Sequence, residues 1–153
     1  MQLVGMSMWV YLMLLAIGLL GAVPFIIRKK HCSEMLKMAL FLALFDFVFE
    51  NVGALQGYWY STGSAFQLLA VPAEVFIIAF CAGSAYALVF PCRFDWHLGI
   101  ASSLVIAAVG TGIEAMLISA GNLHYANGWT SYHAFASYFA VFLAMGRVNE
   151  LLA

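Results

Sequence analysis

Long apolar runs separated by short connections dominate the chain. Five of them cover residues 3–27, 35–57, 66–90, 98–120 and 129–152. Each is long enough to cross the roughly 30 Å hydrocarbon core of a bilayer as a helix. A membrane barrel would instead show short strands of alternating hydrophobicity. The pattern therefore predicts an all-α fold, a five-helix transmembrane bundle that forms one domain over residues 1–153.

The composition supports the same class. The chain is 65% hydrophobic and only 8% charged, whereas about a quarter of the residues of an average soluble domain are charged. The formal net charge of −1 and the absence of a basic patch give no reason to expect nucleic-acid binding. We therefore expect a multi-pass integral membrane protein of the cell (inner) membrane, with the lipid bilayer as its main partner.

The basic residues predict the orientation of the bundle. All six fall on one side of the predicted helices: Arg28, Lys29, Lys30, Lys37, Arg93 and Arg147. The connections 58–65 and 121–128 contain none. Because cytoplasmic loops are enriched in Lys and Arg, the N-terminus is expected outside and the C-terminus in the cytoplasm.

Four carboxyl groups lie inside the apolar runs. Asp46 and Glu50 are in the second run, Glu74 is in the third and Glu114 is in the fourth. At about 1.5 Å per residue, the three glutamates share one layer in the outer half, and Asp46 lies about one turn deeper. Ionisable groups in a spanning segment are expensive and indicate a functional site. We take these four as candidate catalytic residues.

Helical spacing places these acids on polar stripes. The stripe of the second helix contains Ala39, Ala43, Asp46, Glu50, Gly53 and Gly57, and that of the fifth contains His133, Ser137, Ala140, Ala144 and Arg147. Small residues let membrane helices pack closely, and Gly53–Gly57 forms a G-x-x-x-G motif. The stripes are expected to face the inside of the bundle.

Protonated carboxyls in an apolar cavity are good general acids. The same groups could instead bind a metal together with His133, or form hydrogen bonds between helices. Glu114 is close enough to the interface to extend toward water. The three cysteines are widely spaced and imply no disulfide framework. We predict neither a cofactor nor a metal.

One stretch resembles a known family. The pattern E-x-x-G-x-x-x-G-Y-x-Y, formed by Glu50, Gly53, Gly57, Tyr58 and Tyr60, precedes a segment that opens Pro72-Ala73-Glu74. Together these motifs are similar to the membrane-embedded carotenoid-modifying proteins of the lycopene-cyclase-domain and carotenoid hydratase types. The resemblance extends over about residues 46–138 and includes Glu114 and Trp129. The cyclase type usually has a second acid after the P-x-E glutamate, where this chain has Val75, and the chain is shorter than a typical hydratase.

The resemblance implies an acid–base enzyme acting on a hydrophobic, isoprenoid-type substrate. Such an enzyme protonates an alkene and then cyclises or hydrates it, with Glu50 and Glu74 as the leading acids. The residues expected to bind the substrate are Asn51, Tyr58, Tyr60, Trp129 and His133. The Asp46–Glu50 spacing is also similar to that of the sterol-isomerase-like family.

Non-enzymatic alternatives remain open. The chain could be a small subunit of a larger membrane complex, in which the carboxyls join helices. It could also be a transporter that handles protons or cations through the same carboxyls. The sequence leaves open whether its protein partner is a second copy or another member of a complex.

Overall fold

The computed structural model describes residues 7–26, 32–91 and 93–152. Within these ranges the chain forms five helices: α1 (Met8–Ile26), α2 (Cys32–Leu55), α3 (Ala73–Val89), α4 (Trp96–Ser119) and α5 (Ser131–Leu152). It also forms four short strands: β1 (Trp59–Ser61), β2 (Gln67–Leu68), β3 (Val71–Pro72) and β4 (Leu123–Tyr125). The expected mostly helical, five-helix class is confirmed.

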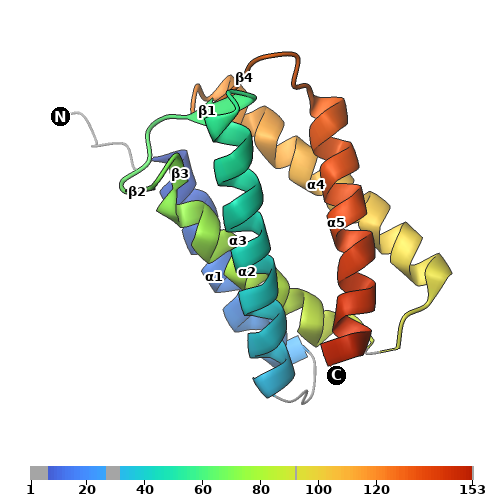
Figure 1. The fold of residues 1–153 in the computed structure, drawn as a ribbon. Coiled ribbons are helices and arrows are strands. Elements are labelled where there is room, and N and C mark those ends of the chain that lie inside the picture. Colours follow the sequence, from blue (N-terminus) through green and yellow to red (C-terminus); the bar gives the residue numbers. More distant parts are fainter. Residues whose placement is uncertain (1–6, 27–31, 92, 153) are drawn as a thin grey trace.

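The helices form two groups (Figure 1). In the first group α3 packs against both α1 and α2, and in the second α4 packs against α5. The groups meet where α2 contacts α5 and where β1 pairs with β4. All four strands lie at one end of the bundle, which we call the strand end (Figure 1).

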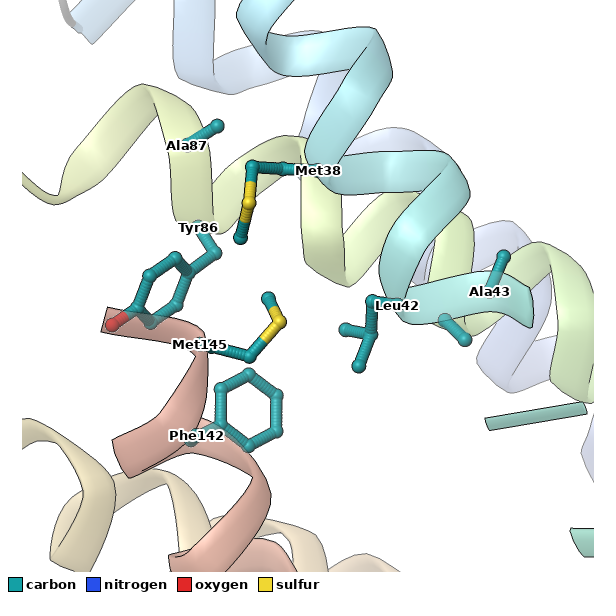
Figure 2. Packing of buried hydrophobic residues seen from close by; sticks show 8 residues of the cluster. Met38, Leu42, Ala43, Tyr86, Ala87, Phe142 and Met145 are labelled. Carbon is teal, nitrogen blue, oxygen red and sulfur yellow. The ribbon is translucent and has the colours of Figure 1, made fainter. Parts of the chain in front are cut away.

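Two clusters of buried side chains hold the groups together. One lies toward the end opposite the strands and includes Met38 and Leu42 of α2, Tyr86 of α3, and Phe142 and Met145 of α5. Figure 2 shows Phe142 and Met145 facing the side chains of α2.

The second cluster closes the strand end. It consists of Trp9, Trp59, Leu117 and Leu123, which come from α1, β1, α4 and β4. The Trp9 indole nitrogen also donates a hydrogen bond of 2.9 Å to the carbonyl of Thr62. The clusters therefore lie at two different levels of the bundle.

The third helix begins later than the sequence predicted. Helix was expected from Phe66, but residues 67–72 form the β2–β3 hairpin and α3 begins at Ala73. Leu69 adopts a left-handed φ of 58° in the turn of this hairpin. Pro72 has an extended conformation directly before the helix. An apolar run of this length does not by itself distinguish a buried hairpin from the first turns of a helix.

Among the residues that the structure describes, two helical segments are long and apolar enough to cross a membrane, Met35–Leu55 and Trp96–Ser119. Shorter apolar segments lie in α1 and α3. Of the basic residues used to predict orientation, Arg28, Lys29 and Lys30 lie outside the described residues. Lys37, Arg93 and Arg147 lie toward the end of the bundle opposite the strands.

Candidate functional site

A cavity of about 270 Å³ lies between the two buried clusters. All five helices and the strand end contribute to its lining, and it is partly open to the outside. Most of the lining is apolar. The polar side chains in it are Asp46, Glu50, Glu114, Tyr125, Ser137 and Tyr138. The structure therefore brings together three of the four predicted acids.

Glu50 is held by a tryptophan from the strand end. The Trp59 indole nitrogen donates a hydrogen bond of 2.8 Å to Glu50 Oε2, and Trp59 is 5% exposed. Its ring lies directly on Gly53, where an added Cβ would come within 2.0 Å of ring carbon atoms. Gly53 was expected to allow close helix packing, but its role here is to make space for Trp59.

Two tyrosines lie beside Glu114. The hydroxyl of Tyr125 in β4 donates a hydrogen bond to Glu114 Oε2, and Tyr138 of α5 lines the cavity beside Glu114. The Tyr138 ring packs on Gly110, where an added Cβ would lie 3.0 Å from it. An aromatic side chain beside each carboxyl thus rests on a glycine of the carboxyl's own helix.

Tyr125 itself is half-buried in β4. Burial raises the pKa of Tyr125 well above its ordinary value of 10, and the hydrogen bond to Glu114 and the negative charge of that group add to the effect. Tyr125 is therefore a neutral phenol at physiological pH, able to donate and accept hydrogen bonds.

Asp46 lies one helical turn from Glu50 on the same face of α2. Its charge would interact with those of Glu50 and Glu114. Among the described residues, no three His, Cys, Asp or Glu side chains are grouped closely enough to hold a metal ion.

The described cations lie elsewhere. Lys37 donates a hydrogen bond of 3.2 Å to the carbonyl of Leu152, and Arg147 pairs with Glu150 at 2.9 Å. Arg93 is exposed in the connection between α3 and α4. Within the ranges that the structure describes, no lysine or arginine lines the cavity.

Glu74 does not line the cavity. Its carboxylate accepts hydrogen bonds from the Ser64 hydroxyl at 2.7 Å and from the Ala65 backbone N–H at 2.9 Å. The side chain is 4% exposed. The structure therefore ties Glu74 to the connection that precedes the β2–β3 hairpin, away from the three other acids.

Only one of the five residues expected to bind a substrate lines the cavity. Trp129 lines the cavity, with its ring centroid 4.7 Å from that of Trp59. Asn51 does not line the cavity. Its side-chain oxygen accepts a 2.9 Å hydrogen bond from the Ala70 N–H, which joins α2 to the hairpin. Its NH₂ group donates a 2.8 Å hydrogen bond to the Phe47 carbonyl within α2.

The three remaining side chains lie outside the lining. Tyr58 packs on Trp129 at 5.7 Å between ring centroids. Tyr60 is 54% exposed and stacks on His124. His133 is exposed, contacts Thr130 Oγ1 through Nδ1 at 2.9 Å and stacks on Trp129.

The sequence interpretation missed the aromatic partners of the carboxyls. Trp59, Tyr125 and Tyr138 were not among the residues expected to form the site. The face of α5 that lines the cavity contains Ala134, Ser137, Tyr138, Val141 and Phe142. These positions have the spacing i, i+3, i+4, i+7 and i+8, so helical periodicity could have found them.

Most residues of the stripe predicted on α5 do not face the inside of the bundle, so that prediction is wrong for them. His133, Ala140, Ala144 and Arg147 are exposed. The stripe was chosen for small and polar residues, but large side chains fill the space between α5 and α2.

Comparisons with protein-family models, with characterised proteins and with solved structures give no match to this chain.

Proposed function

We propose that this chain is a multi-pass protein of the cell membrane whose five helices all cross the bilayer. The exposed apolar surface supports the proposal. Leu44, Val48, Val52 and Leu55 follow one another along α2 and are 47–76% exposed. On α4, Val105 and Val109 are 64% and 58% exposed. Soluble monomers rarely expose such contiguous apolar patches. The strand end would then be the outer end, because the described basic residues lie at the other.

The cavity is proposed to bind one end of a hydrophobic, isoprenoid-type molecule. Its apolar lining suits a hydrocarbon chain. Its volume of about 270 Å³ is close to the lower limit of small-molecule sites, about 300 Å³. A long carotenoid-like chain would therefore place only its terminus beside the carboxyls, and the remainder would extend through the open part of the cavity.

The observation that carries the proposal is the convergence of Asp46, Glu50 and Glu114 on this apolar cavity, which no described lysine or arginine lines. In the proposed reaction, a protonated carboxyl transfers its proton to a carbon atom of the terminal double bond. The π electrons form the new C–H bond and leave a carbocation on the neighbouring carbon. The cation then closes a ring and loses a proton to a second carboxylate, or it captures water and the resulting oxonium group gives its extra proton to that carboxylate.

Aromatic rings support such an intermediate. Trp59, Trp129 and Tyr138 all line the cavity, and the faces of aromatic rings attract cations. This arrangement favours an acid–base enzyme of the cyclase, hydratase or isomerase type over a transporter, which would need polar groups along a path to both sides. Of the two leading acids implied by the family resemblance, Glu50 is retained and Glu114 replaces Glu74.

The test is expression in cells that make lycopene, followed by pigment analysis. The wild-type protein should convert lycopene to a cyclised or hydrated product. Glu50→Gln and Glu114→Gln should abolish the conversion, whereas Glu74→Gln should retain it as the matched control. Unchanged pigments with the wild-type protein, or full activity in both cavity variants, would contradict the proposal.

A further inference from the structure

The helices around the cavity form an open arc. Packing contacts join them in the order α1, α3, α2, α5 and α4, and all five line the cavity. Among the helical residues that the structure describes, no comparable packing joins α4 back to α1. The cavity is partly open to the outside, and its wall is therefore least complete between α1 and α4.

Two leucines of α1 mark this gap. Leu15 and Leu19 line the cavity, yet they are 57% and 60% exposed. Each side chain therefore borders both the cavity and the surroundings of the protein. On the other side of the gap, α4 contributes Ile113 and the half-buried Glu114 to the lining. The gap thus has an apolar rim and gives access to a cavity carboxyl.

The depth of the gap decides what faces it. Toward the strand end the gap is closed, because Trp9 of α1 and Leu117 of α4 belong to one buried cluster. Leu15 and Leu19 lie about 9 and 15 Å from Trp9 along α1, at 1.5 Å per residue. In a hydrocarbon core about 30 Å thick, an opening at this depth faces acyl chains rather than water.

We propose that the gap between α1 and α4 is a lateral portal through which hydrocarbon chains enter the cavity from the membrane. The membrane placement of the portal and the isoprenoid-type nature of its ligand rest on the proposed function. A chain that passes Leu15 and Leu19 exchanges lipid contacts for leucine contacts and breaks no hydrogen bond. A polar molecule would have to give up its hydration on the same route.

The seam between α2 and α5 is the alternative route, because Phe45 of α2 also lines the cavity and is exposed. This seam is bridged at two levels. Phe49 contacts Trp129, with 6.4 Å between their ring centroids, and Leu42 shares a buried cluster with Phe142. The gap beside α1 has such a bridge only at the strand end, among the contacts of the described residues.

Reversible closure of the gap tests the portal without a substrate. The starting protein is the full-length chain with its three cysteines replaced by alanine and with Trp96→Phe. Its remaining tryptophans, Trp9, Trp59 and Trp129, all line the cavity. In vesicles of brominated phosphatidylcholine, bromine atoms on the acyl chains quench tryptophan fluorescence on contact. Acyl chains that enter the cavity should therefore quench this protein.

A benzyl methanethiosulfonate reagent then attaches a benzyl group to Leu15→Cys or Leu19→Cys. This group should remove most of the quenching, and reduction of the mixed disulfide should restore it. Leu14→Cys is the matched control, because Leu14 is exposed on the same helix and does not line the cavity. Its labelling should leave the quenching unchanged.

Equal quenching before and after labelling at both portal positions would overturn the portal. A loss of quenching on labelling of Phe45→Cys alone would also overturn it and would place the entry between α2 and α5. Vesicles supplied with lycopene separate the portal from the reaction. Label-dependent quenching without any pigment conversion would refute the enzyme and keep the portal. Conversion that labelling at Leu15 and Leu19 does not slow would refute the portal and keep the enzyme.

Discussion

Trp59 and Tyr125 lie directly opposite each other on the antiparallel strands β1 and β4. Each donates a side-chain hydrogen bond to a carboxyl group, Trp59 to Glu50 of α2 and Tyr125 to Glu114 of α4. Side chains of directly opposed residues project from the same face of a strand pair. This cross-strand pair therefore fixes the positions of the two carboxyls relative to each other, although they belong to different helix groups.

Gly53→Ala should displace Trp59, because the new Cβ would lie 2.0 Å from its ring. We expect a loss of about 1–3 kcal/mol in the free energy of unfolding from overpacking. The hydrogen bond to Glu50 should weaken as well, which tryptophan fluorescence would report.

Gly112→Ala is the matched control, because no atom lies within 4 Å of its added Cβ. It should be neutral or stabilise by up to about 1 kcal/mol, since alanine favours helix over glycine. Equal unfolding free energies for the two variants in detergent would refute the proposed role of Gly53.

Glu74→Ala should destabilise the fold by about 1–3 kcal/mol, because the Ala65 N–H and the Ser64 hydroxyl lose their buried acceptor. Glu74→Gln should cost less, since its amide oxygen can still accept from Ala65 and its NH₂ group can donate to Ser64. Chemical unfolding of both variants checks this order. The opposite order would mean that the charge of Glu74, rather than its hydrogen bonds, stabilises the connection.

Alkaline pH should weaken the fold through Tyr125. Burial, the hydrogen bond to Glu114 and its charge raise the Tyr125 pKa above 10 in the folded state. The folded protein therefore keeps this proton at pH values where the unfolded chain loses it. Its contribution to stability is fully present below about pH 10 and declines as the pH rises above that value.

Unfolding curves of the wild type and Tyr125→Phe from pH 8 to 11 isolate this contribution. The difference between their unfolding free energies should shrink above about pH 10. A difference that is constant over the whole range would contradict the raised pKa of Tyr125.

Filling the cavity should block ligand processing without unfolding the protein. Ala16 of α1 lines the cavity, and Ala16→Leu would occupy part of its volume of about 270 Å³. Ala22, on the same helix, is exposed and outside the lining, so Ala22→Leu is the control. Pigment conversion should fall in the first variant alone, at equal membrane expression. Full conversion in Ala16→Leu would argue that the ligand binds elsewhere.

The helices could be predicted because long apolar runs determine them almost independently of context. The start of α3 could not be predicted, because residues 66–72 are as apolar as the helical segments. The hairpin that they form is joined to α2 by a hydrogen bond from the Ala70 N–H to Asn51, a contact between residues far apart in sequence. Most of the acid stripe of α2 was predicted correctly from helical spacing, but Gly57 lies beyond the end of the helix and has a left-handed φ of 77°. Asp46 and Glu50 line the cavity, and Ala39, Ala43 and Gly53 are buried.

The residues that bind the buried carboxyls could not be predicted from the sequence, because their contacts depend on how distant segments pack together. Helical spacing gave the depth of Glu74 and Glu114 but not the direction in which each side chain points, so both were placed in one layer. The role of Trp59 depends on the pairing of β1 with β4, two strands more than 60 residues apart in sequence. A three-residue strand has too little pattern to predict such a pairing.

The most direct measurement of the central claim is deuterium incorporation into product. Membranes that contain the protein are supplied with lycopene in D₂O, and the product is examined by mass spectrometry. Alkene protonation by a carboxyl that exchanges with solvent predicts one carbon-bound deuterium per reacted terminus, and no product with Glu50→Gln or Glu114→Gln. Product without deuterium, or labelled product at the wild-type level in both variants, would contradict it.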